Sequence, residues 1–520
     1  MPTTKPLFLR LCYLFVFFSL SANAINAETA PTPPDSSALQ RLRAWAEQLQ
    51  SGPLVQNGVV ALSVRRVSDG ICLFGQHEYT SLSTASTLKL VSTGTALATL
   101  GAAFTYTTYL EYDGALRDST LEGNLYVRGT GDPSLGSGRF KGYPGWAALM
   151  QDMAAQVRRL GIRRISGRVV GDGSFYTDQP APDSWPYGDL GNYYGAGLFG
   201  LNINENLYSV YLDAGAKPDA PAPLLRTDPA LPYLTFTNRA LTGPATTTDD
   251  IYLYGAPFQN TVTVTGVVPL KRTNYSADGA LPDPAYFTAH ALTEQLRRDK
   301  VAVANVPVAH QPGNFGSGVV IPGVGANALS VKPLRRNELA RYGSPPLSEL
   351  ARETNFESLN LYAEALLRSA GRQLRRGATA SWPESISALT TFWQSKGVDV
   401  AGFRPRDGSG LSTSGAMTAH NMTSFLAAMT REPVYTDFYA SIPVVGQSGT
   451  VKNLARNTKA AGNIRAKSGT IEGVRAYAGY FTATDGTRMC FSLMINKYAE
   501  GKYRALTPQL ERLFVLLVGL

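Results

Sequence analysis

Short motifs in this sequence carry hydroxyl, amine and amide side chains at spacings that suit acyl transfer. Ser86 and Lys89 lie three residues apart in the mostly apolar, helix-compatible stretch TASTLKL. A serine hydroxyl is a poor nucleophile near neutral pH and needs a neighbouring base. Three residues along a helix place the two side chains on one face, one turn apart. The pair therefore predicts Ser86 as a nucleophile and Lys89 as its base.

This role for Lys89 requires an amine that has lost its proton. The pKa of lysine is ordinarily about 10.4 and would have to fall toward neutrality. Burial lowers it, and so does a neighbouring cation, for which Lys467 is the candidate. The alternative is that Lys89 is simply solvated and that Ser86 is a buried structural serine. A pattern this short cannot decide between the two interpretations.

A second motif follows in the order that serine acyl-transfer enzymes require. Ser358-Leu359-Asn360 lies in a helical context. We expect Ser358 to pass a proton toward the leaving amine and Asn360 to hold a substrate amide. A helix-capping role for the same two residues would look similar in sequence.

The third motif, Lys467-Ser468-Gly469-Thr470, lies where a predicted strand begins. We expect Lys467 to bind a terminal carboxylate together with a hydroxyl of Ser468 or Thr470. Gly469 has no Cβ, so it allows an edge strand to approach the substrate backbone closely. The backbone N–H groups of Ser86 and Thr470 are then candidates for the oxyanion hole, where donors stabilise the developing negative charge.

The elements that position these motifs come from the two ends of the chain. Residues 38–50 have apolar side chains at helical spacing, and residues 58–80 are predicted to form two strands joined by a Ser-Asp-Gly turn. Residues 462–498 are predicted to form a strand meander, which a final helix follows. Between about residues 100 and 330, short strand-like pieces alternate with turns rich in Gly, Pro and Asp. We therefore predict a two-layer helix-on-sheet domain with an inserted middle region.

The N-terminal residues have the layout of a secretory signal peptide. Lys5 and Arg10 precede the apolar stretch 11–20, and Ala22-Asn23-Ala24 supplies small residues for cleavage. A membrane anchor is the alternative, but it needs about 20 apolar residues, more than this stretch offers. We predict that residues 1–24 are removed. The mature chain, with no stable membrane span, would be secreted across the inner membrane to a periplasmic or extracellular location.

The composition argues against several other classes of function. The chain is 44% hydrophobic and 17% charged, as in ordinary globular proteins. The net charge is +9, but Lys and Arg are scattered, so we predict no nucleic-acid site. The four histidines are dispersed without metal-ligand spacing, and we expect neither a metal nor a cofactor. Cys72 and Cys490 of the mature chain could form a disulfide or remain buried free thiols, and the sequence leaves both open.

The motifs and their flanks resemble the D-alanyl-D-alanine carboxypeptidase/endopeptidase family of penicillin-binding proteins, peptidase family S13, of the penicillin-binding protein 4 type. The long gap from the first motif to the second and the shorter gap to the third are similar to those of the family. The resemblance extends over nearly all of the mature chain. The segments that carry it are NLYVRGTGDPSL, SGRVVGDGSFY, WPYGDLGNYYGAG, SPPLSELARETNFESLNLYAEALLR, DGSGLS and GTVKNLARNTKAAGNIRAKSGTIEGVRAYAGYFTATDG.

The resemblance implies an α/β (α+β) fold. Its transpeptidase-like, β-lactamase-like domain has helices on an antiparallel sheet and is interrupted by nested insert domains. The expected boundaries are residues 28–98 and 333–520 for the two parts of the transpeptidase-like domain. Residues 99–332 are expected to form the inserted mixed α/β region, with two nested domains.

The resemblance also implies residues that bind substrate outside the three motifs. In relatives an aspartate of the insert, in a W-P-x-x-D segment, binds the amino group of diaminopimelate. The matching position is Asp189, followed by the aromatic Tyr194, and an ordinary loop carboxylate is the alternative for Asp189. Two positions differ from some relatives: Thr413 stands where they have an arginine that contacts a substrate carboxylate, and Glu472 where they have a glutamine. Asp407, in DGSG, is expected to tie down its turn, with a role in the site as the alternative.

The implied function is that of a secreted serine-type D-Ala-D-Ala carboxypeptidase or DD-endopeptidase. It would act on peptidoglycan stem peptides and cross-links through a Ser86 acyl-enzyme, and β-lactams would be covalent inhibitors. One alternative is a β-lactamase or esterase on the same scaffold, although no further carboxylate base follows Ser86 at the class A spacing. Another is a catalytically silent wall-binding protein. The balance between the two peptidase activities and the specificity for the stem peptide stay open.

Overall fold

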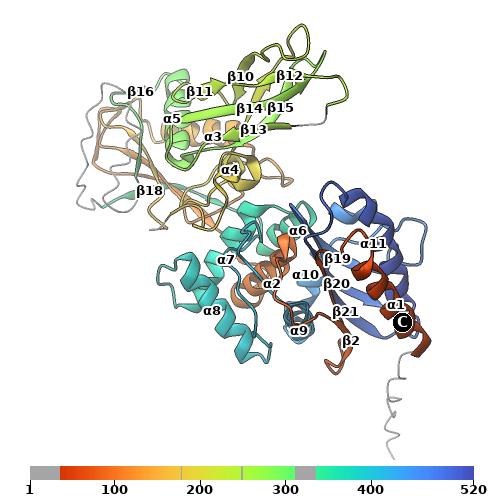
Figure 1. Ribbon diagram of the computed structural model, residues 1–520. Helices are drawn as coiled ribbons and strands as arrows, with labels where there is room; N and C mark the ends of the chain where they lie inside the picture. Colours follow the sequence, from red (N-terminus) through yellow and green to blue (C-terminus); the bar gives the residue numbers. More distant parts are fainter. Residues whose placement is uncertain (1–35, 177–178, 248–249, 311–334) are drawn as a thin grey trace, which may run out of the picture. The chain divides into compact units, whose positions relative to one another are not determined.

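The computed structural model describes residues 36–520 except for 177–178, 248–249 and 311–334 (Figure 1). The predicted signal peptide therefore lies outside the described residues. The described chain is an α/β protein with one five-stranded sheet from the two ends of the chain and further sheets from its middle. None of the helices described here is both long and apolar enough to cross a bilayer.

The sheet built from the two ends of the chain has five strands in the order β19-β20-β21-β1-β2, and all neighbouring strands are antiparallel. β1 pairs with β21, with Val59 opposite Asn496 at one end and Arg66 opposite Met489 at the other. The red and blue ends of the chain therefore lie side by side in Figure 1. The two predicted N-terminal strands and the predicted C-terminal meander are confirmed. The strands are β1 (Val59–Arg66), β2 (Cys72–Gln76), β19 (Arg465–Ile471), β20 (Val474–Thr482) and β21 (Arg488–Asn496).

Helices cover both faces of this sheet because its strands are apolar on both sides. Along β20, Tyr477 and Phe481 join the core with the first and last helices, while Ala476 and Ala478 join the core with the other helices. On one face lie α1 (Ser36–Ser51) and α11 (Tyr503–Val518). The helices of the other face are α2 (Lys89–Leu100), α6 (Leu347–Phe356), α7 (Asn360–Leu374), α8 (Trp382–Ser395), α9 (Ala419–Met429) and α10 (Tyr435–Ala440).

The strands between β2 and β19 form four further sheets, which share a separate hydrophobic core with α3 (Trp146–Arg159) and α5 (Pro284–Arg298). A short helix, α4 (Tyr187–Leu190), precedes the turn η2 (Tyr193–Gly195). The strands are β3 (Thr107–Tyr112), β4 (Ala115–Arg117), β5 (Thr120–Glu122), β6 (Leu125–Arg128), β7 (Arg164–Ile165), β8 (Val169–Asp172), β9 (Leu207–Leu212), β10 (Leu224–Asp228), β11 (Thr235–Asn238), β12 (Leu241–Gly243), β13 (Asp250–Tyr254), β14 (Thr261–Pro269), β15 (Tyr275–Ala280), β16 (Ala302–Val303), β17 (Val308–His310) and β18 (Asn337–Gly343).

The expected C-terminal boundary of the insert, residue 332, falls outside the described residues. β18, which follows that boundary, pairs with β3 in a sheet of the middle region and not with the sheet β19-β20-β21-β1-β2. Because a strand belongs with the sheet that satisfies its backbone hydrogen bonds, we propose that the insert begins before β3 and ends after Gly343.

Cys72 and Cys490 are free thiols. Cys72 of β2 and Cys490 of β21 both lie opposite Arg65 of β1, the strand between them. Two strand spacings therefore separate the two cysteines. That distance, about 9.5 Å, is too long for a disulfide. Cys490 is buried, and burial raises the pKa of its thiol to about 12. Of the two alternatives that the sequence left open, free thiols are present, although Cys72 is exposed on the edge strand β2.

Candidate active site

Ser86 lies in the 3₁₀ turn η1 (Ala85–Leu88), which leads directly into α2. We expected an α-helix at this position. In a 3₁₀ turn, side chains three residues apart are directly above one another, which brings Ser86 and Lys89 closer together. The Nζ of Lys89 donates a 2.8 Å hydrogen bond to the Oγ of Ser86. It donates a second, of 2.9 Å, to the carbonyl of Ser409.

Lys89 is fully buried, whereas Ser86 is only half-buried and is accessible from the solvent. Burial lowers the pKa of Lys89 to about 7, although the charges of Asp407 and Glu364 oppose the shift. The solvated lysine of the alternative interpretation is therefore excluded. Lys89 has the environment that a general base near neutral pH requires.

Ser358 lies between α6 and α7, with a φ of +61°. This left-handed backbone is uncommon for a residue with a side chain and is characteristic of functional sites. Leu359 occupies the N-cap of α7 and no side chain caps the helix there, so the capping interpretation of Ser358 is not supported. The Nζ of Lys467 donates a 3.0 Å hydrogen bond to the Oγ of Ser358.

Lys467, on β19, is also fully buried. Its Nζ donates a further hydrogen bond of 2.7 Å to the carbonyl of Ser468. Burial and the charge of Lys89 hold the pKa of Lys467 well below its usual value. We expected the charge of Lys467 to lower the pKa of Lys89, but burial lowers it, and the charge of Lys89 instead lowers the pKa of Lys467.

Gly469 places the edge strand β19 directly against the turn that carries Ser86. A Cβ at this position would lie 2.8 Å from the carbonyl oxygen of Thr84 and 2.9 Å from the backbone nitrogen of Ser86. Only glycine permits this approach. The backbone N–H groups of Ser86 and of the strand are therefore close neighbours, as an oxyanion hole requires.

Asn360 begins α7, and its Nδ2 donates a 2.6 Å hydrogen bond to the carbonyl of Tyr194. The hydroxyl of Tyr194 in turn donates a 3.1 Å hydrogen bond to Oδ1 of Asp189, on α4. Burial raises the pKa of Asp189, and the Tyr194 hydroxyl opposes the shift. The structure thus connects the second motif to both residues that the family resemblance suggested.

The remaining predicted residues lie at the outer side of β19. Ser468 is half-buried, and its hydroxyl shares a 2.7 Å hydrogen bond with that of Thr450. Thr470 is exposed and accepts a hydrogen bond at Oγ1 from Arg475 of β20. Glu472 is exposed in the turn between β19 and β20.

Two buried carboxyl groups, those of Asp407 and Glu364, interact electrostatically with the Lys89 amine. Asp407 accepts hydrogen bonds from the backbone N–H groups of Gly410 and Ser412, so it ties down its turn as expected. Glu364 of α7 accepts from Ser409, Gly408 and Trp382, and sequence analysis did not identify it. Burial and the charge of Asp407 raise the pKa of Glu364 to about 7. A glutamate within the apolar helical stretch NLYAEALL was the one signal available.

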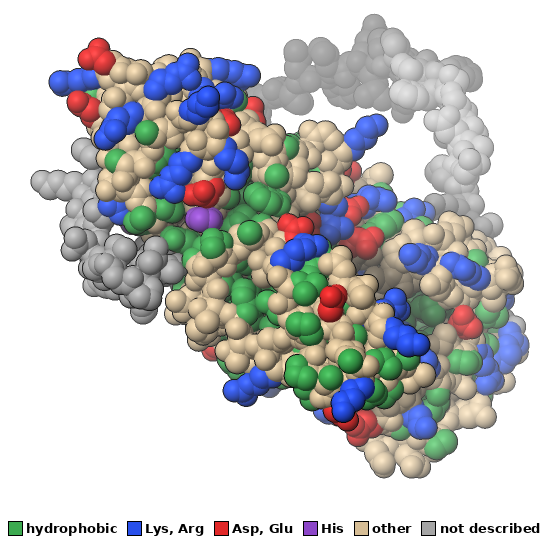
Figure 2. Space-filling view, turned by 90° about the horizontal axis from the view of Figure 1, so that it is seen from above, with side chains coloured by type: hydrophobic (Ala, Val, Ile, Leu, Met, Phe, Trp, Pro, Cys, Tyr) green, Lys and Arg blue, Asp and Glu red, His purple; other side chains and the backbone are tan. Residues whose placement is uncertain are grey.

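Other kinds of site receive no support from the described residues. Within them, no three His, Cys, Asp or Glu side chains gather closely enough to hold a metal ion. Lys and Arg side chains are spread over the face shown in Figure 2, with Asp and Glu among them, as the scattered sequence positions predicted.

The sequence and the fold are similar to those of known proteins. The model of the D-Ala-D-Ala carboxypeptidase 3 (S13) family matches residues 42–513. The D-alanyl-D-alanine carboxypeptidase of Actinomadura sp. (strain R39) is 27% identical over 492 residues, which cover 92% of this chain and 85% of the relative.

Solved structures share the same fold. Penicillin binding protein 4 from Haemophilus influenzae matches with a TM-score of 0.74 at 21% identity, covering 91% of this chain and 97% of that chain. The structure of the same protein complexed with a β-lactam matches with a TM-score of 0.70 at 20% identity, covering 90% of this chain and 97% of the other. The predicted fold class is confirmed.

Proposed function

Since this chain belongs to the D-Ala-D-Ala carboxypeptidase 3 (S13) family of serine hydrolases, we propose that it is a D-Ala-D-Ala carboxypeptidase whose nucleophile is Ser86. The observation that carries the proposal is the 2.8 Å hydrogen bond from a fully buried lysine, Lys89, to the half-buried Ser86 hydroxyl. A serine beside a buried amine with a pKa of about 7 has a base available at physiological pH.

In the acylation step, Oγ of Ser86 attacks the carbonyl carbon of the penultimate D-alanine while its proton moves to Nζ of Lys89. The carbonyl oxygen becomes negatively charged and accepts hydrogen bonds from the backbone N–H groups of Ser86 and Thr470. One such donor is worth about 3 to 4 kcal/mol in the transition state. Collapse of the tetrahedral intermediate breaks the C–N bond and leaves the acyl group on Ser86.

The departing D-alanine amine needs a proton. Ser358 can deliver it, because its hydroxyl accepts a hydrogen bond from Lys467, a proton source within the same buried site. A carboxylate at the end of the substrate, bound beside Lys467, Ser468 and Thr470, would favour the charged form of Lys467. Water then hydrolyses the acyl-enzyme by the reverse sequence of proton transfers.

We assign Asn360 to a substrate amide, and Asp189 and Tyr194 to the stem peptide. The support is the hydrogen-bond chain from Asn360 through the main chain of Tyr194 to Asp189. We also assign Glu472 to the substrate or its cross-linked neighbour, and the support is its exposed position next to the third motif. Peptidoglycan stem peptides and cross-links are the proposed substrates, and β-lactams are the proposed covalent inhibitors.

We also propose that residues 1–24 direct export and are removed, so that the enzyme acts in a periplasmic or extracellular location. The layout of Lys5, Arg10 and the apolar stretch 11–20 supports this. N-terminal sequencing of the mature protein tests it, because cleavage after Ala24 leaves Ile25 as the first residue. An intact N-terminus on the exported protein would contradict it.

Mass spectrometry after penicillin treatment tests the proposed mechanism. We expect a stable acyl adduct on the peptide that contains Ser86, and release of D-alanine from a pentapeptide substrate. Ser86→Ala removes both, whereas Ser83→Ala, a matched control on the same segment, retains both. An adduct on another residue contradicts the mechanism. Rapid turnover of a β-lactam without release of D-alanine would favour a β-lactamase, and an unreactive Ser86 would favour a wall-binding protein.

A further inference from the structure

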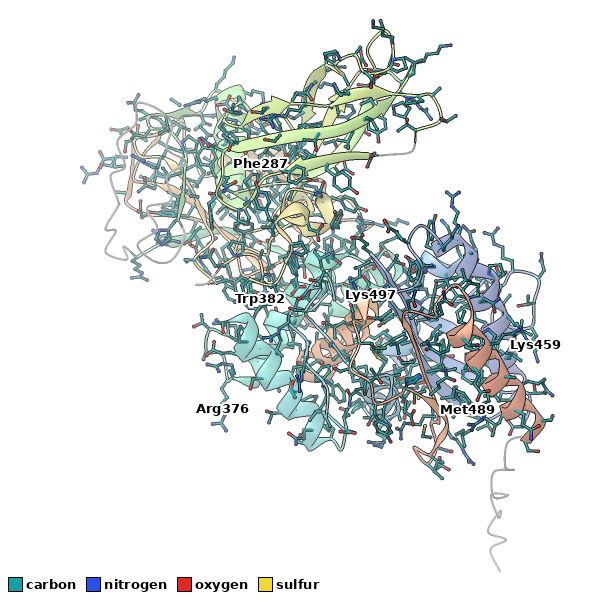
Figure 3. All side chains as sticks on the ribbon, in the orientation of Figure 1. Phe287, Arg376, Trp382, Lys459, Met489 and Lys497 are labelled. Atoms are coloured by element: carbon teal, nitrogen blue, oxygen red, sulfur yellow. The ribbon has the colours of Figure 1, made fainter. Side chains whose placement is uncertain are left out.

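The mechanism above leaves Glu364 without a function, although this carboxyl group is completely buried. Its Oε1 accepts a 2.8 Å hydrogen bond from the backbone N–H of Ser409. Its Oε2 accepts bonds of 2.8 Å from the N–H of Gly408 and 2.9 Å from the indole of Trp382, which is labelled in Figure 3. Burying a carboxyl group is costly unless such donors satisfy it, so Glu364 is held by several donors in one position.

Asp407 is the second carboxyl group of this cluster and is 1% exposed. Its Oδ1 accepts from the N–H of Gly410 at 2.9 Å, and its Oδ2 from the N–H of Ser412 at 2.7 Å. Oδ2 also accepts a 2.9 Å bond from the indole of Trp185, in the middle region of the chain. Between them, Glu364 and Asp407 fix the backbone of the loop 407–412.

This loop contacts the reacting residues at two points. The carbonyl of Ser409 accepts the 2.9 Å hydrogen bond from Nζ of Lys89. Gly410, with a φ of +79°, approaches the turn of Ser86 so closely that a Cβ would lie 2.0 Å from the carbonyl oxygen of Ala85. The position of the loop therefore fixes the position of the Lys89 amine relative to the Ser86 hydroxyl.

The charges around Lys89 come from several elements. Asp407 and Glu364 face it and favour its charged form. Lys467, from β19, faces it with the same sign of charge. Arg368, on α7 with Glu364, stacks over the ring of Trp382 with its guanidinium carbon 4.1 Å from the ring centroid. Glu364 is the only one of these four groups that directly contacts the N–H of Ser409, whose carbonyl Lys89 binds.

Building on the proposed function, we propose that Glu364 is a positioning residue for Lys89. It holds the Ser409 carbonyl in place as the acceptor of the Lys89 amine, and its negative charge sets the pH at which that amine loses its proton. Asp407 supports it by fixing the other side of the loop.

The test is the rate of Ser86 acylation by a fluorescent penicillin, measured from pH 5 to pH 9. In the wild type the rate rises with pH as Lys89 loses its proton. Glu364→Gln removes a negative charge facing Lys89, which then loses its proton at lower pH. We expect the midpoint of the rise to move down by about one pH unit, the size of effect that a nearby opposite charge exerts. We also expect the plateau to fall about 10-fold, because a misplaced base slows the reaction.

One further variant separates the effect of charge from that of packing, and another serves as a control. Glu364→Asp keeps the charge and shortens the side chain, so the plateau falls while the midpoint stays. Asp113→Asn is the matched control, because Asp113 is another carboxyl group 1% exposed, bonded to Asn124 and Tyr126 in the middle region. We expect neither midpoint nor plateau to change there. A lower plateau in Glu364→Gln with an unchanged midpoint would show a purely structural role and overturn the proposal.

Trp382→Phe provides a second measurement in case Glu364→Gln does not fold. It removes one neutral donor to the carboxyl group, so Glu364 stays protonated to higher pH and the midpoint again moves down, by a smaller amount. A midpoint identical to that of the wild type would overturn the proposal. Failure of the proposed function is distinguishable, because the wild-type protein itself would then not be labelled at Ser86.

Discussion

The side-chain amide of Asn360 donates a 2.6 Å hydrogen bond to the main-chain carbonyl of Tyr194. Asn360 belongs to the second motif, whereas Tyr194 belongs to the middle region of the chain. The same tyrosine binds Asp189 through its hydroxyl. One chain of hydrogen bonds therefore joins Asn360 of the second motif to Asp189 of the middle region. Under the proposed function, a change at Asp189 can be separated from a change at Ser86 by the choice of substrate.

Asp189→Asn removes the charge that we expect to bind an amino group of the stem peptide. We expect KM for amine-bearing stem peptides to rise about 10-fold, as the loss of one charge-assisted contact predicts, with a small effect on kcat. Penicillin acylation should be unaffected. Asp183→Asn, on an exposed residue of the same segment, is the control. An equal rise in KM for the N-acetylated peptide would contradict a role in amine binding.

Lys89→Arg replaces the base with a guanidinium that keeps its proton at all accessible pH values. Positive charge is retained and basicity is lost, so we expect acylation to fall by about 10²- to 10⁴-fold. In the wild type the rate should fall as the pH decreases below about 7, because burial places the pKa of Lys89 there and only the neutral amine accepts a proton. Stopped-flow measurement of the acylation rate gives both the loss in Lys89→Arg and the pH dependence of the wild type. The exposed Lys452→Arg should behave as the wild type.

Gly469→Ala introduces a methyl group 2.9 Å from the backbone nitrogen of Ser86 and 2.8 Å from the carbonyl oxygen of Thr84. Because backbone atoms cannot give way cheaply, β19 must move away from the turn of Ser86. We expect a loss of about 10²- to 10³-fold in acylation, the effect of removing one oxyanion donor. Gly343→Ala is the control, since a Cβ there has no neighbour within 4 Å. Equal rates for the two variants would exclude the close approach of β19.

Arg139 and Glu205 form a bidentate pair, to which the buried Tyr362 hydroxyl also donates. Glu205→Gln leaves the partly buried Arg139 with only the longer 3.9 Å contact to Glu353 as counter-charge, and we expect a loss of about 2 kcal/mol in the free energy of unfolding. Glu338→Gln breaks a bidentate pair of the same type with the exposed Arg341. It should cost much less free energy of unfolding, because water screens an exposed pair. Urea unfolding measures the difference, and equal costs would contradict it.

The sequence predicted what depends on local spacing. Ser86 and Lys89 are close in the chain, so their contact follows from almost any helical turn, and the strands around Lys467 follow from alternation and turns. The type of turn at Ser86 could not be predicted, because it depends on a left-handed Ala85, with a φ of +41°, against which the distant Gly410 packs.

Glu364 could not be predicted for a different reason. Two of its three partners are backbone N–H groups of a loop after α8, and a backbone donor leaves no trace in a sequence. Similarly, the bond between Asn360 and Tyr194 uses a main-chain carbonyl. Motifs identify side chains that react, whereas the groups that hold those side chains in place are found only when the chain is folded.

The pairing of β1 with β21 has a consequence for the timing of folding. These two neighbouring strands of the five-stranded sheet lie at opposite ends of the sequence, so the sheet closes only after nearly the whole polypeptide has been made. A chain that stops before residue 488 leaves β1 and β20 as two separate open edges, which are prone to aggregation. Lys467 lies on β19, which pairs with β20, and the turn of Ser86 contacts both of these strands. A chain that stops before residue 488 therefore lacks part of the sheet that positions the two proposed catalytic residues relative to each other.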